Sequence, residues 1–326
     1  MNYSMNTAIY AVLIAFLANI VLCPMLIPAL RRLKFGQQVR GDGPRTHLKK
    51  AGTPTMGGIM IVISFLLAAA IFMRENAHAL AVILATLGFG IVGFLDDFIK
   101  IIKKRSLGLR AWQKFLGQLV VAGGFIAHWR TLPGYATEIL IPFFPNLTFD
   151  LGFLFPAFAV LIFLSCTNGA NLTDGLDGMA AGVTALIAVF FMFTAWMLGS
   201  PILPVIGAAV GSLMGFLLFN SHPARVFMGD TGSLALGGFV AAVALMLQMP
   251  LFLLIVAIIY VIETSTVIIQ VVYFRLSGGK RIFPMTPIHH SFELSGWAET
   301  KIVAFFYVVT AMACLVGYLA FRGFAA

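Results

Sequence analysis

The chain has 326 residues, of which 60% are hydrophobic and 10% are charged, and its formal net charge is +9. This composition excludes an ordinary water-soluble domain, because no soluble fold of this length needs so much apolar surface. It also argues against nucleic-acid binding, since no basic soluble module with groove-reading or stacking residues is present. We therefore expect an all-α polytopic integral membrane protein.

Ten windows of about 20 predominantly apolar residues are each long enough to cross a hydrocarbon layer about 30 Å thick. In chain order they lie at about 6–29, 55–73, 78–95, 114–130, 152–169, 178–198, 202–219, 234–250, 252–273 and 301–321. The ten windows predict about ten transmembrane helices. Residues 1–326 are expected to form one membrane domain, with no separate soluble domain.

The basic residues predict the orientation of these helices. Eighteen of the 21 Lys and Arg lie on the side of the loops at about 30–54, 96–114, 170–177, 220–233 and 274–300, and only Arg74, Arg130 and Arg322 lie on the other. The positive-inside rule places the eighteen in the cytoplasm and both termini outside. Such a basic face attracts anionic lipid head groups or a polyanionic substrate. The external segment 131–150 is expected to form a hairpin.

Five aspartates lie at the cytoplasmic ends of the windows. Asp96 and Asp97 end the third window, Asp174 and Asp177 begin the sixth, and Asp230 begins the eighth. Helix capping accounts for single aspartates at helix starts, such as Asp174 and Asp230. It does not account for Asp96 and Asp97, because the helix dipole disfavours carboxylates near a C-terminus.

The adjacent carboxylates of Asp96 and Asp97 need positive charge nearby. Lys100 supplies part of it, because it follows them by four and three residues. A divalent cation would supply more, and oxygen ligands without Cys or clustered zinc-type His favour Mg²⁺ or Mn²⁺. We therefore predict a cytoplasmic cleft with a metal-bound phosphate rather than separate helix caps.

Two polar segments accompany the aspartates. NGANLTDGLDG supplies Asn168 and Asn171, glycines that let a ligand approach the backbone, and Thr173, which is expected to cap the next helix. The segment before Asp230 contains Asn220 and Phe227. Phe227 is either a lipid or core contact or a surface on which a base stacks.

The last cytoplasmic loop carries a pair of histidines. The Thr-Pro dipeptide at 286–287 predicts a helix start, which places His289 and His290 in the first turn and Glu293 one turn later. This pair is a candidate for binding phosphate or orienting a ligand. Glu263, inside the ninth window, is either a functional carboxylate or a neutral structural one that neighbouring polar groups satisfy.

Five motifs occur in order: THLKKAGTPTMGG (46–58), GFLDDFIK (93–100), NLTDGLDGMA (171–180), FNSHPARVFMGDTGSLALGG (219–238) and PIHHSFE (287–293). The DD and TDG motifs are weak singly, but five motifs in this order in a ten-window chain are very specific. Over essentially its whole length the chain resembles the bacterial phospho-N-acetylmuramoyl-pentapeptide transferase family, within the polyprenyl-phosphate hexosamine-1-phosphate transferase superfamily.

The resemblance implies a reaction at the cytoplasmic face of the bacterial inner membrane. UDP-N-acetylmuramoyl-pentapeptide would give its phospho-sugar to undecaprenyl phosphate, forming lipid I and UMP, with Mg²⁺ as cofactor. This is the first membrane step of peptidoglycan synthesis. The resemblance also suggests a homodimer.

The candidate site residues combine this resemblance with the polar segments described above. The catalytic candidates are Asp96, Asp97, Asp174, Asp230, His289 and His290, and the metal ligands are Asp96, Asp97 and Asp230. The substrate-binding candidates are Lys50, Lys100, Lys114, Asn168, Asn171, Gly175, Leu176, Asp177, Asn220 and Phe227. Phe227 and residues 175–177 resemble the family's uridine site. The family usually has a third His where this chain has Ser291, which leaves His289 and His290 as the candidates.

Three other functions compete with this interpretation. A transferase for UDP-N-acetylglucosamine would share the DD motif, although the 46–58 and 287–293 motifs favour the muramoyl-pentapeptide substrate. An ion transporter needs acids in mid-span, and an intramembrane aspartyl protease needs two facing Asp within the bilayer. Nearly all acids here lie at one face instead. The mechanism is open between direct attack by the prenyl phosphate, with Asp96 as base, and an aspartyl phospho-enzyme.

Overall fold

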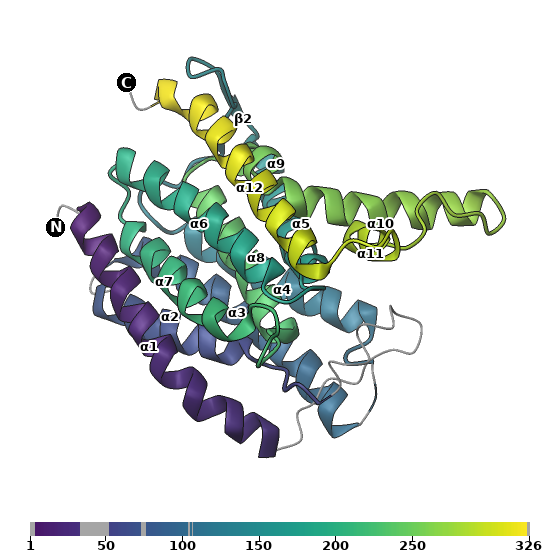
Figure 1. The fold of residues 1–326 in the computed structure, drawn as a ribbon. Coiled ribbons are helices and arrows are strands. Elements are labelled where there is room, and N and C mark those ends of the chain that lie inside the picture. The colour runs from purple at the N-terminus through teal and green to yellow at the C-terminus, as the bar shows by residue number, and fades with distance from the viewer. Residues whose placement is uncertain (1–3, 33–51, 73–75, 104, 106, 325–326) are drawn as a thin grey trace.

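The computed structural model describes residues 4–32, 52–72, 76–103, 105 and 107–324. Most of these residues are helical and only six form strands, which confirms the predicted all-α fold (Figure 1). The long helices are α1 (Met5–Arg32), α2 (Gly58–Phe72), α3 (Ala77–Ile102), α4 (Ala111–Trp129), α5 (Phe155–Thr173), α6 (Met179–Met197), α7 (Leu203–Asn220), α8 (Gly229–Met246), α10 (Ile258–Leu276) and α12 (Glu299–Phe321). The short elements are β1 (Glu138–Leu140), β2 (Thr148–Asp150), η2 (Gly152–Leu154), η3 (Pro250–Phe252), α9 (Leu253–Val256), α11 (Ile288–Leu294) and η4 (Arg322–Phe324).

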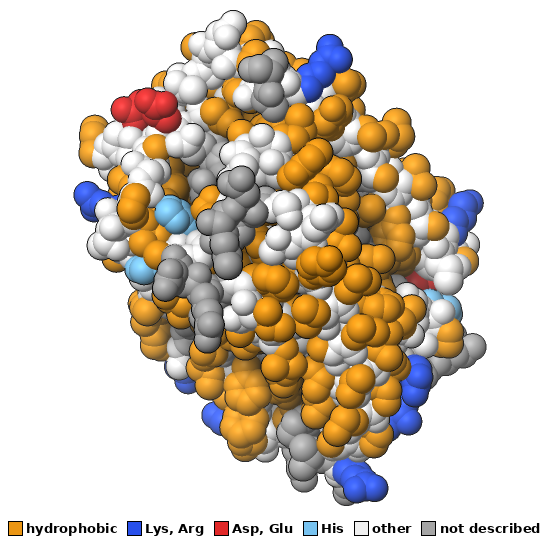
Figure 2. Space-filling view, turned by 90° about the vertical axis from the view of Figure 1, so that its left-hand side faces the viewer, with side chains coloured by type: hydrophobic (Ala, Val, Ile, Leu, Met, Phe, Trp, Pro, Cys, Tyr) orange, Lys and Arg blue, Asp and Glu red, His pale blue; other side chains and the backbone are white. Residues whose placement is uncertain are grey.

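Eight of the described helices are long and apolar enough to cross a membrane, namely α1, α3, α5, α6, α7, α8, α10 and α12. The two other predicted windows fall on α2, which has only 15 residues, and on α4, which has 19 but carries Lys114, Gln118 and His128. In Figure 2, hydrophobic side chains cover the middle of one face, and Lys and Arg lie at its edges. This distribution is typical of a surface that contacts lipid.

The ninth predicted window, 252–273, falls on two helices, α9 and α10, and α10 is long and apolar enough to cross a membrane. The helix is interrupted between α9 and α10 at Ala257, whose φ of −100° and ψ of 31° are not helical. Beyond this break α10 extends away from the other helices (Figure 1). It exposes apolar side chains such as Ile268, Val272 and Leu276, which suit contact with lipid rather than water.

Helix α8 forms the centre of the bundle, because every residue from Thr231 to Leu245 is buried. It packs against α3 and α5. The approach of α3 is close: a Cβ at Gly93 would lie 2.0 Å from the carbonyl oxygen of Asp230. Only a residue without a side chain allows the two backbones to come this near. This contact brings the end of α3 beside the start of α8.

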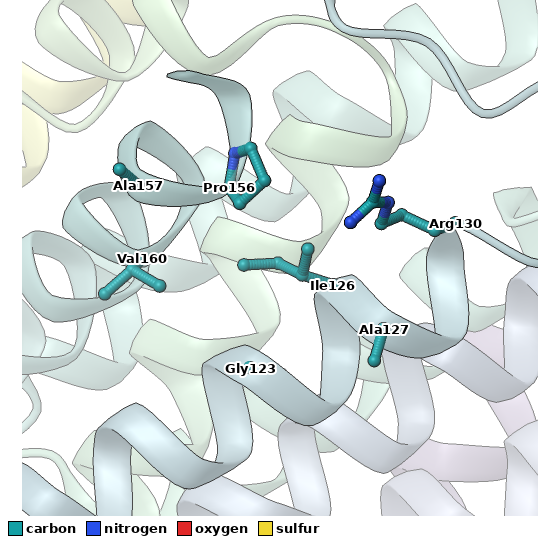
Figure 3. A pocket seen from close by; sticks show the side chains of 7 residues that line it. All are labelled: Gly123, Ile126, Ala127, Arg130, Pro156, Ala157 and Val160. Carbon is teal, nitrogen blue, oxygen red and sulfur yellow. The ribbon is translucent and has the colours of Figure 1, made fainter. Parts of the chain in front are cut away.

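The segment 131–150 contains the predicted hairpin, in which β1 and β2 pair antiparallel with Glu138 opposite Asp150. The N–H of Leu140 ties the hairpin to the bundle by donating to the carbonyl of Gln248 at 2.8 Å. A groove of about 370 Å³ lies between α4 and α5 (Figure 3), lined by Gly123, Ile126, Ala127, Arg130, Pro156, Ala157 and Val160. It lies toward the ends of these helices that are opposite to the polar site described next.

Candidate active site

Three of the five aspartates come together where α3 meets α8. One carboxylate oxygen from each of Asp96, Asp97 and Asp230 lies within 4.8 Å of the other two. Asp96 and Asp97 are 4% and 3% exposed and lie in the last turns of α3. Asp230 lies in the first turn of α8. We call these three residues the acidic cluster.

Two lysines balance most of the negative charge of the acidic cluster. Lys100 Nζ lies 2.6 Å from Asp96 Oδ2, 3.5 Å from Asp97 Oδ1 and 3.1 Å from Asp230 Oδ2. Lys114 Nζ, in the first turn of α4, lies 2.9 Å from the same oxygen of Asp230. The Lys100 ammonium thus contacts all three carboxylates. When all five groups are ionised, one formal negative charge remains.

Neighbouring donors fix the orientation of the two carboxylates of α3. Thr231 donates to Asp97 Oδ2 from its N–H at 2.9 Å and from its hydroxyl at 2.8 Å. The N–H of Leu109 donates to Asp96 Oδ1 at 2.8 Å. Hydrogen bonds to charged groups are stronger than neutral ones, so each carboxylate is held in one rotamer. The sequence patterns did not single out Thr231 or Leu109.

Helix α5 contributes its C-terminal residues. Asn171 Nδ2 donates to Asp230 Oδ1 at 2.9 Å. Asp174 follows the last residue of α5 and accepts a hydrogen bond from the backbone of Gly229. The protein around Asp174 removes water from its carboxyl, and together with the negative charges of Asp230 and Asp97 this raises the pKa of Asp174 to about 8. The hydrogen bond from Gly229 opposes this shift.

Thr173 does not cap the following helix, so this prediction is wrong. Thr173 ends α5, and its hydroxyl donates to the carbonyl of Gly169 at 2.8 Å. Helix α6 begins only at Met179, after Gly178, whose φ is +80°. The turn between the two helices therefore separates Thr173 from the helix start that it was expected to cap.

The helices also extend further into the predicted cytoplasmic loops than their apolar windows do. Helices α3 and α4 cover the two ends of the 96–114 loop, α5 covers the start of 170–177, and α8 covers the end of 220–233. Charged and polar residues are tolerated in these helix ends because they contact one another inside the protein rather than lipid.

Leu176 and Asp177 lie in a neighbouring set of contacts. Asp177 Oδ2 accepts from the N–H of Ala224 at 3.0 Å and lies 3.1 Å from His222 Nδ1. Glu299 Oε1 accepts the N–H of Asp177 at 2.7 Å. The side chains of Asp177, His222 and Glu299 also lie within 4.8 Å of one another. These contacts join the turn after α5, in which Leu176 is buried, to the loop before α8 and to α12.

Two predicted asparagines make their hydrogen bonds away from the acidic cluster. Asn220, which ends α7 and is 3% exposed, donates to the carbonyl of Val226 at 3.0 Å. Asn168 donates to Gln118 Oε1 at 3.2 Å and so links α5 to α4. Both side chains support the scaffold around the site.

The segment around Phe227 is paired with a segment from the first quarter of the chain. The N–H of Phe227 donates to the carbonyl of Pro54, and its carbonyl accepts the N–H of Gly57, both at 2.8 Å. This pairing docks the GTPTMGG turn onto the loop that leads to Asp230. Lys50 lies outside the described residues, so its role stays a prediction.

The histidine pair lies on α11, which begins directly after 286–287 as predicted. His290 Nδ1 lies 2.8 Å from Glu293 Oε2, in agreement with their spacing. His289 pairs instead with Glu263 of α10, at 3.0 Å between Nδ1 and Oε2. The ring of His289 also lies against Gly175, because a Cβ there would be 2.1 Å from its Nε2.

Ser291, at the position of the family's usual third histidine, holds the loop before α11. Its hydroxyl donates to the carbonyl of Met285 at 2.5 Å and accepts the N–H of Met285 at 3.2 Å. These two hydrogen bonds tie Ser291 to the backbone of Met285, so the side chain stabilises the conformation of the loop.

The acidic cluster fits a divalent cation. Mg²⁺ prefers carboxylate and phosphate oxygens, and the three carboxylates are close enough for one ion to bind them. The side chain of Asp230 is 17% exposed, so an ion held there could also contact a ligand from solution. A site of this kind, with acidic and basic groups at helix ends, is suited to anionic phosphate groups.

A family model described as Glycosyl transferase family 4 matches residues 79–248. This match and the fold define the class of protein as a membrane-spanning glycosyl transferase. A signature of phospho-N-acetylmuramoyl-pentapeptide-transferases also matches residues 50–62.

Relatives of that name cover nearly the whole chain. The one from Acetivibrio thermocellus is 48% identical and covers 98% of this chain and 97% of its own length. Those from Clostridium kluyveri and Caldanaerobacter subterraneus subsp. tengcongensis are each 49% identical and cover 97% and 95% of this chain, and 99% and 97% of their own lengths. The chain therefore belongs to the phospho-N-acetylmuramoyl-pentapeptide-transferase family of enzymes.

Proposed function

We propose that the chain transfers phospho-N-acetylmuramoyl-pentapeptide from UDP to undecaprenyl phosphate, forming lipid I and UMP in the first membrane step of peptidoglycan synthesis. One observation carries the proposal: three carboxylates and two lysines from α3, α4 and α8 share one site at the ends of membrane helices. Such a site is suited to a reaction between a water-soluble diphosphate and a lipid phosphate, which must be held together at the membrane surface.

We place this site at the cytoplasmic face of the bacterial inner membrane, with both termini outside. The distribution of the basic residues supports this orientation, since 18 of 21 lie on the side of the acidic cluster. The family resemblance supports a homodimer.

In this proposal Asp96, Asp97 and Asp230 hold Mg²⁺, which when bound would offset negative charge on the diphosphate and on the leaving UMP. Lys100 and Lys114 lie beside the same carboxylates and add positive charge without a change of conformation. Asn171, which donates to Asp230, holds that carboxylate in place.

Asp96 is the candidate base for a prenyl phosphate that still carries one proton. Leu109 and Lys100 each contact a different oxygen of Asp96, so its carboxylate is held in one orientation. An oxygen of the prenyl phosphate then attacks the sugar-linked phosphorus, and the bond to UMP breaks. In the rival scheme a carboxylate attacks first and forms a phospho-enzyme. A single-turnover reaction without prenyl phosphate separates them, because UMP equal in amount to the enzyme would contradict direct attack.

The decisive experiment measures UMP release from UDP-N-acetylmuramoyl-pentapeptide and undecaprenyl phosphate, with and without Mg²⁺. We expect Asp230→Asn to lower the rate by about 100-fold or more, as expected when a charged group at a reacting phosphate is lost. Asp150→Asn is the matched control, because Asp150 lies in the external hairpin. Full activity of Asp230→Asn, or of wild type without divalent cation, would contradict the metal assignment. UDP-N-acetylglucosamine as a competing donor tests the substrate assignment.

A further inference from the structure

A buried pair of ionisable side chains connects α10 to α11. Glu263 is 0% exposed and His289 is 1% exposed, and Glu263 Oε2 lies 3.0 Å from His289 Nδ1. Within the described residues, the two remaining polar atoms of the pair, Glu263 Oε1 and His289 Nε2, are buried and have no hydrogen-bond partner. Leaving a buried polar atom without a hydrogen bond is costly, so the presence of these two atoms calls for an explanation.

The unpaired nitrogen of His289 faces the turn that follows α5. A Cβ at Gly175 would lie 2.1 Å from Nε2, 2.5 Å from Cε1 and 3.1 Å from Cδ2 of the ring. The edge of the imidazole that carries Nε2 is therefore the part nearest to Gly175. Gly175 directly follows Asp174, whose carboxyl accepts from the backbone of Gly229 beside Asp230. The free nitrogen thus lies beside a turn that also contacts the start of α8, where Asp230 lies.

The charge of the pair determines what this nitrogen can do. A buried carboxylate without a compensating proton is costly, so burial favours a pair that carries no net charge. In both neutral forms, carboxylic acid with imidazole and carboxylate with imidazolium, one proton lies between Oε2 and Nδ1. In both forms Nε2 also carries a hydrogen, so the free nitrogen is a hydrogen-bond donor.

We propose that Glu263 is a positioning residue that keeps His289 Nε2–H as a donor toward an oxygen of the substrate bound at the turn 174–176. This inference rests on the proposed function for the identity of the substrate, but the state of the ring does not depend on it. Glu263 does not touch the substrate. It fixes the orientation of the His289 ring by pairing with Nδ1, as carboxylates orient histidine rings in other sites.

Two substitutions of Glu263 distinguish a role in positioning His289 from a role in the stability of the fold. Glu263→Gln keeps the volume and can donate its amide N–H to Nδ1, which preserves Nε2–H. Glu263→Leu removes any partner of Nδ1. We expect Glu263→Leu to lower kcat/KM for UMP release by at least about 10-fold, the effect of one misdirected hydrogen bond to a charged acceptor. Glu263→Gln is expected to recover most of that loss.

A double-mutant cycle provides the readout that a merely structural role would not give. When His289 is already Ala, Glu263→Leu is expected to lower kcat/KM by less than about a further twofold. The rates of the single and double variants are compared at a temperature at which both are folded. Equal losses in the two backgrounds would overturn the proposal. So would a Glu263→Gln enzyme as damaged as Glu263→Leu.

A measurement without substrate keeps the inference separate from the proposed function. Nitrogen NMR of protein with ¹⁵N-labelled histidine, assigned by comparison with His289→Ala, is expected to show a protonated Nε2 in wild type and in Glu263→Gln. An unprotonated Nε2 in wild type would overturn the inference even if UMP is released. A protonated Nε2 in an enzyme that releases no UMP would leave the inference standing and contradict the proposed function.

Discussion

Gly93 sets the distance between α3 and α8, so Gly93→Ala is expected to separate the halves of the acidic cluster. The new Cβ would lie 2.0 Å from the carbonyl oxygen of Asp230 and 2.8 Å from Thr231 Cα. An ordinary contact needs at least 3.4 Å, so the two backbones must move apart by about 3.4 − 2.0 = 1.4 Å. Both neighbouring atoms belong to backbone, which cannot rotate away as a side chain can.

The consequence for activity exceeds the consequence for stability. Overpacking of this kind costs about 1–3 kcal/mol, and alanine recovers about 0.5–1 kcal/mol through its better helix propensity. A misplacement of about 1 Å at a reacting site can cost about 100-fold in rate. We therefore expect the rate of UMP release to fall about 100-fold, while the melting temperature falls by only a few degrees.

The matched control is Gly124→Ala in α4, where a Cβ meets nothing within 4 Å. This variant gains helix propensity without a clash and is expected to be as active as wild type and slightly more stable. UMP release by Gly93→Ala within about threefold of Gly124→Ala would refute the link between this close approach and the geometry of the cluster.

Three further changes test single contacts of the site. Thr231→Val removes the hydroxyl that donates to Asp97 at 2.8 Å but keeps the backbone donor, and it is expected to lower the free energy of unfolding by about 1.5–3 kcal/mol in chemical denaturation. Gly175→Ala forces the ring of His289 away and is expected to raise KM for the nucleotide substrate at least about 10-fold; an unchanged KM would contradict contact between this turn and the substrate. The pKa of Asp174 is raised to about 8, so the folded state binds a proton at this group more tightly than the unfolded state does. In metal-free buffer the contribution of Asp174 to the free energy of unfolding therefore falls as the pH rises from about 4 to about 8. Asp174→Asn is expected to flatten that part of the melting-temperature profile, and an unchanged slope would show that the carboxyl is already ionised.

The membrane fold and the position of the acidic cluster were predictable because most of the apolar windows mark helices that can cross the bilayer. Once the third and eighth windows were placed, Asp96, Asp97 and Asp230 had to lie at the same depth. The contacts of Lys100 with Asp96 and Asp97 were predictable from helical spacing, and so was that of His290 with Glu293. These contacts depend on positions within one helix or on one shared boundary.

Contacts between helices were not predictable in the same way, since they depend on how each helix is rotated about its axis. The pairing of His289 with Glu263 joins residues 26 positions apart. The only signal in the sequence was a carboxylate inside an apolar window, which left its partner undefined. The interruption at Ala257 had no Gly or Pro at the break, and the bond from Asn168 to Gln118 required the packing of α4 on α5.

The contacts of Lys100 with three carboxylates have a consequence for handling the protein. Three carboxylates without a counter-ion would repel one another once a bound metal ion was removed, and the helices that carry them would move apart. In this protein the ammonium group of Lys100 lies among the three carboxylates and acts as a counter-ion that belongs to the chain. Purification in chelating buffer is therefore expected to leave the bundle folded, and adding magnesium afterwards is expected to restore turnover without refolding.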